Sequence, residues 1–318
     1  MISRFLAFFD RHGTRLLASG LFIGLILQPV AHAIWPLLPA LVFLLTAATM
    51  LRIDWPQVIA HARHPQRIGL LVLWALVISP VLIAAVVRIV GVPTGLAEAL
   101  VLWAASPPLM SLPAIALLLG LDAALALLVM VAATFLVPLS LPPLVLGLMG
   151  LDPGIGIGPL MARLAVVVGG AGVAAGLLRW HLGRERLRRL GTEISGINVL
   201  LLVLFAVGVM DGMSAHLVHE PLRVLGYCAA ALGASLGLQA VSFLSFGWLG
   251  RSSALTMGLI GGNKNMAVVW ASLGAATNSP DLMLYFACAQ LPIYLLPAAL
   301  APIYRRLGAT VARAAPAD

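Results

Sequence analysis

The feature that most limits the fold of this chain is a series of long apolar runs with little polar sequence between them. The runs lie at about 15–34, 36–51, 68–91, 96–120, 123–149, 158–180, 194–211, 222–247, 253–275 and 282–304. Most of them approach or exceed the roughly 20 residues that a helix needs to cross a bilayer. Charged residues make up only 9% of the chain, against about 25% in soluble domains. The runs exclude an ordinary soluble enzyme and predict an all-α integral membrane protein with about ten transmembrane helices.

The arginines indicate how these spans are oriented. With the N-terminus in the cytoplasm, 15 of the 19 basic residues fall in cytoplasmic segments, while the opposite links at 151–158 and 277–281 contain no Lys or Arg. Cytoplasmic loops of membrane proteins collect basic residues. We therefore expect a multi-pass protein of the cell (inner) membrane with both termini in the cytoplasm. The net charge of +8 then reflects topology, and the expected partner is the lipid bilayer and not nucleic acid.

The ten runs divide into two groups of five near residue 155. Because five is odd, the second group would cross the membrane in the opposite sense to the first. This predicts a single transmembrane domain at 15–306, built from inverted repeats at about 15–150 and 157–306.

The two ends of the chain are expected to lie outside that domain. Residues 1–14 mix aromatic and charged side chains, which is typical of a short interfacial helix, and residues 307–318 would form a cytoplasmic tail. The alternative for the N-terminus is a signal peptide with its cleavage site at Ala31-His32-Ala33, which would leave nine spans.

The fourth and ninth runs contain clusters that disfavour a continuous helix. Three prolines within seven residues cannot sustain one, and paired glycines followed by Asn-Lys-Asn are poor membrane helix. The predicted helix-break residues are Pro107, Pro108 and Pro113 in the fourth run and Gly258, Gly261 and Gly262 in the ninth. Both runs are fourth in their half, and matched breaks in inverted halves indicate a transporter site near the midplane. Simple kinks packed against neighbouring helices are the alternative.

Lys264 is the most informative single residue. It is the only lysine in the chain and lies more than ten residues from either end of its run. A charge at such depth costs at least about 2.5–3.5 kcal/mol, so the protein must compensate it. Three roles stay open: a ligand for an anionic substrate, a protonation switch, and a structural cation that binds carbonyls freed by the break.

Other polar residues within the runs are weaker candidates for a substrate or cation site, because packing hydrogen bonds would also explain them. These residues are Asn263, Asn265, Ser106, Ser111, Thr134, Gln239 and Gln290. Asp122 is expected to cap the fifth span. The order of His216, His219 and Glu220 does not match a zinc-protease helix, and the sequence offers no catalytic constellation or nucleotide loop. We expect no enzyme activity, metal or cofactor.

Two stretches resemble the bile acid:sodium symporter superfamily, which also contains arsenite efflux carriers. They are Trp103–Met149, with a proline-broken helix and then Leu-Asp-Ala-Ala-Leu, and Ala254–Ala275, with Ala-Leu-Thr before Asn263. The resemblance implies that broken helices 4 and 9 cross in a core of spans 3–5 and 8–10, beside a panel of spans 1, 2, 6 and 7. It also implies that substrate binds between panel and core near the crossover and that transport proceeds by alternating access.

The sequence departs from the family at the cation sites. Sodium-coupled members place a glutamate in the ninth helix at about Gly258, and no acidic residue occurs here between Glu220 and Asp281. Of their fourth-helix ligands, only Ser111 has a counterpart. Arsenite carriers use a fourth-helix cysteine where this chain has alanine, so arsenite transport is not expected.

The resemblance with these departures implies a symporter-like secondary active transporter of small organic anions. Its sodium coupling would be altered or absent, with a proton or the Lys264 ammonium in place of sodium. A conventional sodium symporter with different ligands, and a non-transporting receptor or a channel on the same fold, are the alternatives. Substrate identity, transport direction and oligomeric state stay open.

Overall fold

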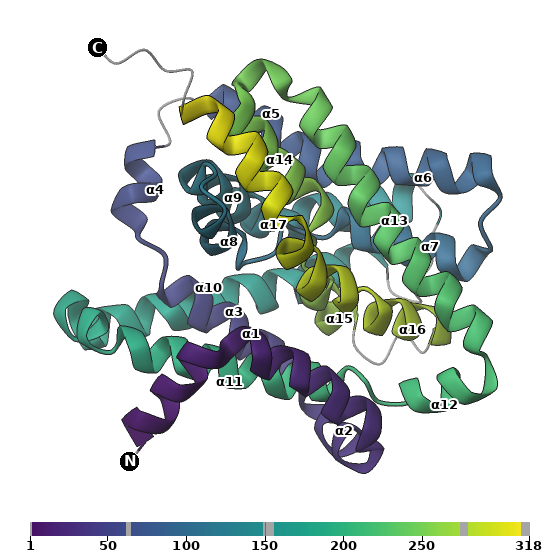
Figure 1. Cartoon of the computed structure of the whole chain (residues 1–318), viewed down its shortest axis with the longest axis horizontal. Coiled ribbons are helices and arrows are strands. Elements are labelled where there is room, and N and C mark those ends of the chain that lie inside the picture. Colours follow the sequence, from purple (N-terminus) through teal and green to yellow (C-terminus); the bar gives the residue numbers. More distant parts are fainter. Residues whose placement is uncertain (1, 62–64, 149, 151–155, 274–278, 313–318) are drawn as a thin grey trace. The chain divides into compact units, whose positions relative to one another are not determined.

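The computed structural model describes residues 2–61, 65–148, 150, 156–273 and 279–312 (Figure 1). Within these ranges all regular elements are helices, and β-type pairing is confined to one isolated bridge. The predicted all-α class is therefore confirmed. Residues 151–155 and 277–278, which belong to the links used to predict orientation, lie outside the described residues.

Six described helices are long and apolar enough to cross a membrane. They are Gln28–Leu51, Pro65–Val90, Ala123–Gly147, Ile157–Arg189, Gly191–His219 and Pro221–Ser245. Pro280–Pro297 and Ala299–Leu307 form a seventh if the two parts, bent by 45°, are one span. Gln28–Leu51 covers the second predicted run and the end of the first, and each of the others overlaps one predicted run. The chain is a multi-pass membrane protein.

The fourth and ninth runs each form two shorter helices. The fourth comprises α7 (Thr94–Ala105) and α8 (Leu112–Leu118), and the ninth comprises α14 (Arg251–Gly262) and α15 (Met266–Leu273). These interruptions account for two of the predicted spans that are not long helices, and the count of ten spans stays a prediction.

The N-terminal helices differ from the predicted boundaries. A single helix, α1 (Ile2–Ile26), passes without interruption through residue 14, where a separate interfacial segment was predicted to end. The chain breaks at Leu27 (φ −98°, ψ 66°) and continues as α2 (Gln28–Ile34), η1 (Trp35–Leu37) and α3 (Leu38–Leu51). Proline stands in the first turn of each of these three elements, where its missing N–H is tolerated. Helical structure therefore continues through residue 35, where the sequence predicted a boundary.

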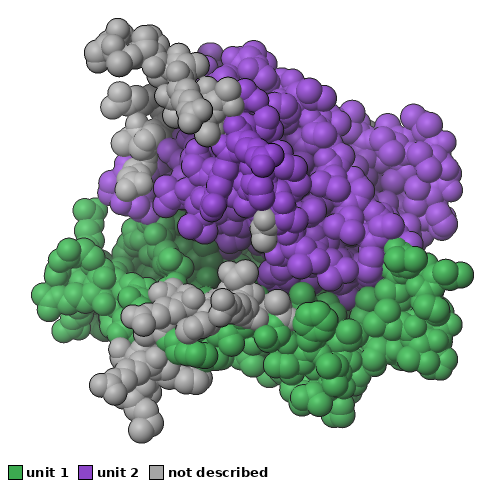
Figure 2. All heavy atoms as spheres, in the orientation of Figure 1, with its two compact units in different colours: residues 1–53, 159–225, 267–277 green, residues 54–158, 226–266, 278–318 purple. Residues whose placement is uncertain are grey.

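The chain forms two compact units, coloured separately in Figure 2. Unit 1 comprises residues 1–53, 159–225 and 267–277. It contains α1–α3, nearly all of α10 (Ile157–Arg189), α11 (Gly191–Gly208) and α12 (Met213–His219). Helix α1 packs along α11, and Gly20, Gly24 and Gly196 leave too little room for a side chain there. Small residues allow such close approach of membrane helices.

Unit 2 comprises residues 54–158, 226–266 and 278–318. It contains α4 (Trp55–His61), α5 (Pro65–Leu73), the π-helical turn η2 (Trp74–Ile78), α6 (Ser79–Val90), α7, α8, α9 (Ala123–Pro142), the π-helical turn η3 (Pro143–Leu148), most of α13 (Pro221–Ser245), η4 (Gly247–Leu249), α14, α16 (Pro280–Cys288) and α17 (Gln290–Ala312). Helix α7 packs against α6 and α16, while α14 packs against α9 and α17. The largest fully buried side chains of unit 2 include three aromatic ones, Trp103, Tyr285 and Phe286. The side chain of Lys264 is among them as well.

Candidate functional site

The two broken helices of unit 2 meet backbone to backbone. Pro108 and Lys264 form an isolated antiparallel bridge. The Leu109 N–H donates to the Asn263 carbonyl at 3.0 Å, and the Asn265 N–H donates to the Pro107 carbonyl at 2.7 Å. Backbone groups released by a break must find partners inside a bilayer. The bridge supplies those partners and defines the crossover.

The prolines explain where the fourth run breaks. Pro107 and Pro108 cannot donate to the preceding turn, and the residue before a proline is biased toward extended backbone. Ser106, which directly follows α7, is extended at φ −67° and ψ 152°. Pro113 lies in the first turn of α8, so it begins a helix instead of breaking one.

The ninth run breaks later than the glycines predicted. Gly258, Gly261 and Gly262 lie inside α14, and the break falls at 263–265. A Cβ at Gly258 would lie 2.9 Å from the Gln239 carbonyl oxygen of α13, and one at Gly262 would collide with the same helix. These glycines therefore allow α13 and α14 to approach closely, as small residues do at i, i+3 and i+4. The i, i+3, i+4 spacing of the three glycines is the sequence feature that indicates close helix packing here.

Lys264 is fully buried and bound to the third predicted span. Its Nζ donates to the Ala75 carbonyl at 2.6 Å and to Ser79 Oγ at 3.1 Å. In the π-helical turn η2, the Ser79 N–H bonds to the Trp74 carbonyl, and Pro80 has no N–H. The Ala75 carbonyl thus loses both of these backbone donors, and the Ser79 hydroxyl (3.0 Å) and Lys264 replace them.

Both partners of Lys264 are neutral groups. No carboxylate of the described chain forms an ion pair with it. An ammonium has three donors, and the bonds to Ala75 and Ser79 occupy two of them. In its ammonium form Lys264 therefore gives the site a net positive charge that only carbonyl and hydroxyl dipoles stabilise.

Asn263 and Asn265 flank this lysine. Asn263 is 1% exposed and donates its Nδ2 to the Leu259 carbonyl at 2.8 Å. Its Oδ1 accepts no hydrogen bond from any described residue. Asn265 is half-buried and contributes its N–H to the bridge. Buried polar atoms usually have a partner, so the unpaired oxygen of Asn263 marks the crossover as incompletely satisfied.

Three of the other predicted polar candidates form local side-chain hydrogen bonds. Each donates to the carbonyl four residues earlier: Ser106 to Leu102 at 2.8 Å, Thr134 to Met130 at 2.7 Å and Gln290 to Phe286 at 3.0 Å. Ser111 is exposed and caps no backbone group of α8. These side chains fit packing hydrogen bonds, which was the alternative stated for them.

Gln239 belongs to a buried chain of hydrogen bonds that ends beside the crossover. Tyr304 Oη donates to Gln239 Oε1 at 2.7 Å, and Gln239 Nε2 donates to Ser235 Oγ at 3.3 Å. Ser235 Oγ donates in turn to the Gly262 carbonyl at 2.6 Å. This chain satisfies the last carbonyl of α14 and so holds the end of that helix. Sequence reasoning missed Tyr304 and Ser235, because no local pattern links them to the break.

Asp122 caps the fifth predicted span. Its Oδ1 accepts from the Leu125 N–H at 3.0 Å, and its Oδ2 accepts from Ser253 Oγ of α14 at 3.2 Å. Its own N–H donates to Thr256 Oγ1 at 3.0 Å. The residue therefore joins α9 to α14 besides capping α9.

Asp281, at the start of α16, joins neighbouring helices as Asp122 does. Its carboxylate accepts from the Tyr227 hydroxyl of α13 and lies where a Cβ on Gly95 of α7 would stand. Cys228 and Cys288 are both thiols, without a disulfide between them. His216 and Glu220 form only an ion pair at 3.9 Å, and the described residues contain no group of three or more metal-ligating side chains.

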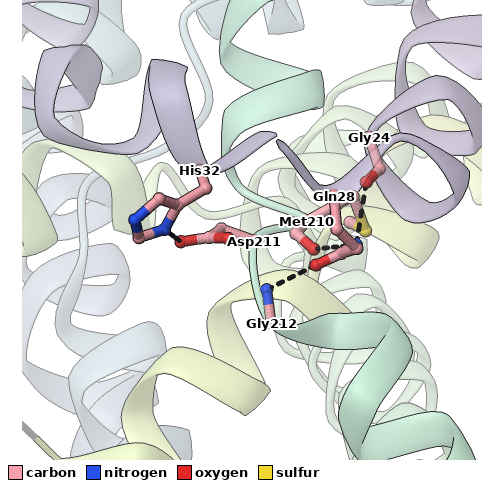
Figure 3. Close-up of polar contacts among 6 residues, drawn as sticks. All are labelled: Gly24, Gln28, His32, Met210, Asp211 and Gly212. Atoms are coloured by element: carbon pink, nitrogen blue, oxygen red, sulfur yellow. Dashed lines mark hydrogen bonds and ion pairs between the residues drawn. The ribbon is translucent and has the colours of Figure 1, made fainter. Parts of the chain in front are cut away.

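Unit 1 contains a second polar cluster, at the break after α1 (Figure 3). Gln28 Nε2 donates to the carbonyls of Gly24 (2.9 Å), Leu25 (3.1 Å) and Met210 (3.1 Å), and its Oε1 accepts from the Gly212 N–H at 2.8 Å. Next to it, the exposed His32 pairs with Asp211 at 3.1 Å. Both ends of the Gln28 amide are bonded, so this cluster joins the break after α1 to the turn after α11.

Comparison with known proteins adds no family assignment. No protein-family model matches the chain, and no curated protein matches it. The functional argument therefore depends on the geometry of the crossover.

Proposed function

We propose that this protein is a secondary active transporter of small organic anions, with the architecture of the bile acid:sodium symporter superfamily. In this proposal the Lys264 ammonium replaces the coupling sodium ion. The observation that carries the proposal is the bridge between two broken helices, with a buried lysine at its centre that pairs with no carboxylate of the described chain. Interrupted helices that meet at membrane depth are typical of transporter sites.

A constant separation in sequence supports the inverted repeat. Pro108 and Lys264, the two bridged residues, are 156 positions apart. The same separation relates the first residues of Pro65–Val90 and Pro221–Ser245. Two side-chain hydrogen bonds show it too: the donors Thr134 and Gln290 are 156 positions apart, and so are their acceptors Met130 and Phe286. Bridge, helix start and side-chain bond thus agree on one register between the two halves.

The division into two units supports the same architecture. Unit 1 holds the first, second, sixth and seventh predicted spans, which the resemblance assigns to a panel. It also holds the second part of the ninth run, from residue 267, which the resemblance assigns to the core. Unit 2 holds the third, fourth, fifth, eighth and tenth spans with the first part of the ninth, which it assigns to a core. The crossover lies within unit 2.

The surroundings of Lys264 support an anionic substrate. A positive charge in a low-dielectric site attracts an anion far more strongly than it would in water. The third Nζ donor and the unpaired Asn263 Oδ1 offer one donor and one acceptor at the crossover. A carboxylate would bond the donor, and a hydroxyl or amide N–H elsewhere on the same molecule would satisfy the acceptor.

The absence of an acidic residue between Glu220 and Asp281 supports sodium independence. Sodium prefers oxygen ligands that include a carboxylate, and a fixed ammonium would repel a second cation within a few ångströms. The same argument does not exclude a proton, which could accompany the anion as the coupling ion.

The test is transport by the purified full chain in liposomes, after a thermal-shift screen of organic acids with and without sodium. A ligand that binds only the folded form raises the melting temperature with its concentration. We expect saturable uptake and counterflow of such an acid without sodium. Lys264→Ala should abolish both, whereas Thr134→Ala, which removes a buried bond within one helix, should retain them.

Four outcomes would contradict the proposal. Stabilisation and uptake that require sodium would indicate a conventional symporter. Conductance that does not saturate would indicate a channel, and ligand binding without flux would indicate a receptor. Full transport by Lys264→Ala would exclude the role given to the lysine.

A further inference from the structure

The end of α10 changes direction at a glycine. Gly183 has φ 73° and ψ 159° inside Ile157–Arg189, a conformation that only glycine adopts readily. The kink separates a long apolar helix from the short helical segment 184–189. A side chain at this position would meet no neighbour within 4 Å, so the glycine serves the backbone conformation and not close packing.

The helix before the kink presents an exposed apolar stripe that ends in tryptophan. Val166, Val173, Leu177 and Trp180 are all exposed, and Trp180 is 83% exposed. Their spacings of seven, four and three place them on one face of the helix. An exposed apolar face on a transmembrane helix contacts lipid tails, and tryptophan is enriched where tails meet headgroups. Trp180 therefore indicates the level of the headgroups.

The residues around and after Trp180 are strongly basic. Between 179 and 189 there are five arginines and one glutamate, a formal net charge of +4. Arg179 is already used, since it donates to the carbonyls of Leu51 (2.6 Å) and Ile53 (2.5 Å) after α3. Arg188 and Arg189 bond Glu185 at 3.2 and 3.0 Å.

Arg184 and Arg186 differ from these neighbours. Both are exposed, and neither bonds any residue of the described chain. Arg52, which lies between the two residues whose carbonyls hold Arg179, is exposed as well. Three unpaired guanidinium groups thus belong to the part of unit 1 that carries Trp180.

We propose that Trp180, Arg184, Arg186 and Arg52 form a docking surface for anionic phospholipid headgroups. The stripe of α10 positions the acyl chains, and the guanidinium groups bind the phosphate, for which their paired donors are well suited. Basic clusters next to a transmembrane helix bind anionic lipids in this way. The inference does not depend on transport and would hold for any activity of this chain.

The test compares phosphatidylglycerol with phosphatidylcholine, each titrated into delipidated full-length protein in neutral detergent. Native mass spectrometry counts bound lipid, and the melting temperature reports stabilisation. We expect phosphatidylglycerol to bind more tightly, with an advantage that salt reduces. Inorganic phosphate at the same concentration should not reproduce it, because phosphate has no acyl chain for the stripe.

Three variants locate the surface. Arg184→Gln with Arg186→Gln should weaken phosphatidylglycerol binding about tenfold or more, and Glu185→Gln should strengthen it by removing the competing carboxylate. Arg305→Gln with Arg306→Gln removes the same charge from α17 and should leave binding unchanged. Equal binding of both lipids, or an equal loss in the two double variants, would overturn the inference.

Discussion

The breaks after α1 and after α14 interrupt two apolar helices in different ways. At the first, one neutral amide, that of Gln28, bonds three carbonyls and one N–H. At the second, the backbone bonds another broken helix, a lysine is buried, and the Asn263 Oδ1 is left unpaired. A break needed only for shape can be fully satisfied by neutral groups. Burying a charge and an unpaired acceptor is costly, which argues that the crossover has a function beyond shape.

After the loss of transport expected for Lys264→Ala, the largest expected effect tests this difference at Asn263. Asn263→Ala removes the unpaired acceptor and one bond to Leu259. We expect transport to fall at least about tenfold, while the free energy of unfolding falls by only about 1 kcal/mol, the net worth of one hydrogen bond. Counterflow in liposomes and thermal unfolding measure the two quantities. Unchanged transport would mean that the unpaired acceptor at the crossover has no more function than the neutral break after α1.

A second effect concerns the packing that positions the crossover. Gly262→Ala forces a Cβ against the Ser235 carbonyl and the Gln239 side chain, and overpacking of this kind typically costs about 1–3 kcal/mol. Gly233→Ala is the matched control, because no atom lies within 4 Å of its Cβ. Chemical unfolding in detergent should separate the two variants; equal stability would mean that α13 and α14 can move apart freely.

The third effect is the reverse of the first and concerns the break in unit 1. Gln28→Ala leaves the Met210 carbonyl and the Gly212 N–H without their partner. Unsatisfied groups of this kind cost about 1–3 kcal/mol, so the melting temperature should fall. Transport per folded molecule should stay at the wild-type level. A specific loss of transport without loss of stability would assign a functional role to this cluster as well.

The smallest effect concerns the ion pair beside Gln28. The His32 side chain is 80% exposed, and exposed pairs contribute at most about 1 kcal/mol. His32→Ala should therefore change the melting temperature much less than Gln28→Ala does. A larger loss than that of Gln28→Ala would show that the pair, and not the amide, holds the break together.

Local sequence signals predicted the elements that depend on local causes. Run length identified the membrane helices, and Pro107 with Pro108 identified one break, because both follow from the backbone of the residues concerned. The glycines of α14 misled the prediction, since the same residue type breaks helices and allows close packing. Only the position of α13 distinguishes the two roles, and that position depends on the tertiary structure.

The partners of Lys264 could not be predicted for a similar reason. Ala75 lies 189 residues away in sequence, and its carbonyl accepts because a π-helical turn and Pro80 deprive it of backbone donors. The residue type alanine does not indicate that its carbonyl lacks a backbone donor. Sequence reasoning could say that Lys264 needs compensation, but the compensating group depends on which turn of a distant helix lies opposite.

The covalent attachment of Lys264 has an energetic consequence. A sodium ion that travels with an anion adds its own concentration gradient and cancels the anion's charge, whereas a tethered ammonium returns to its starting point in every cycle. In the proposed transporter it would contribute to affinity but would supply no driving force. Each monovalent anion carried without a proton would then move one net charge, worth about 2.3 kcal/mol per 100 mV of membrane potential. A membrane that is negative inside would drive such a carrier toward export.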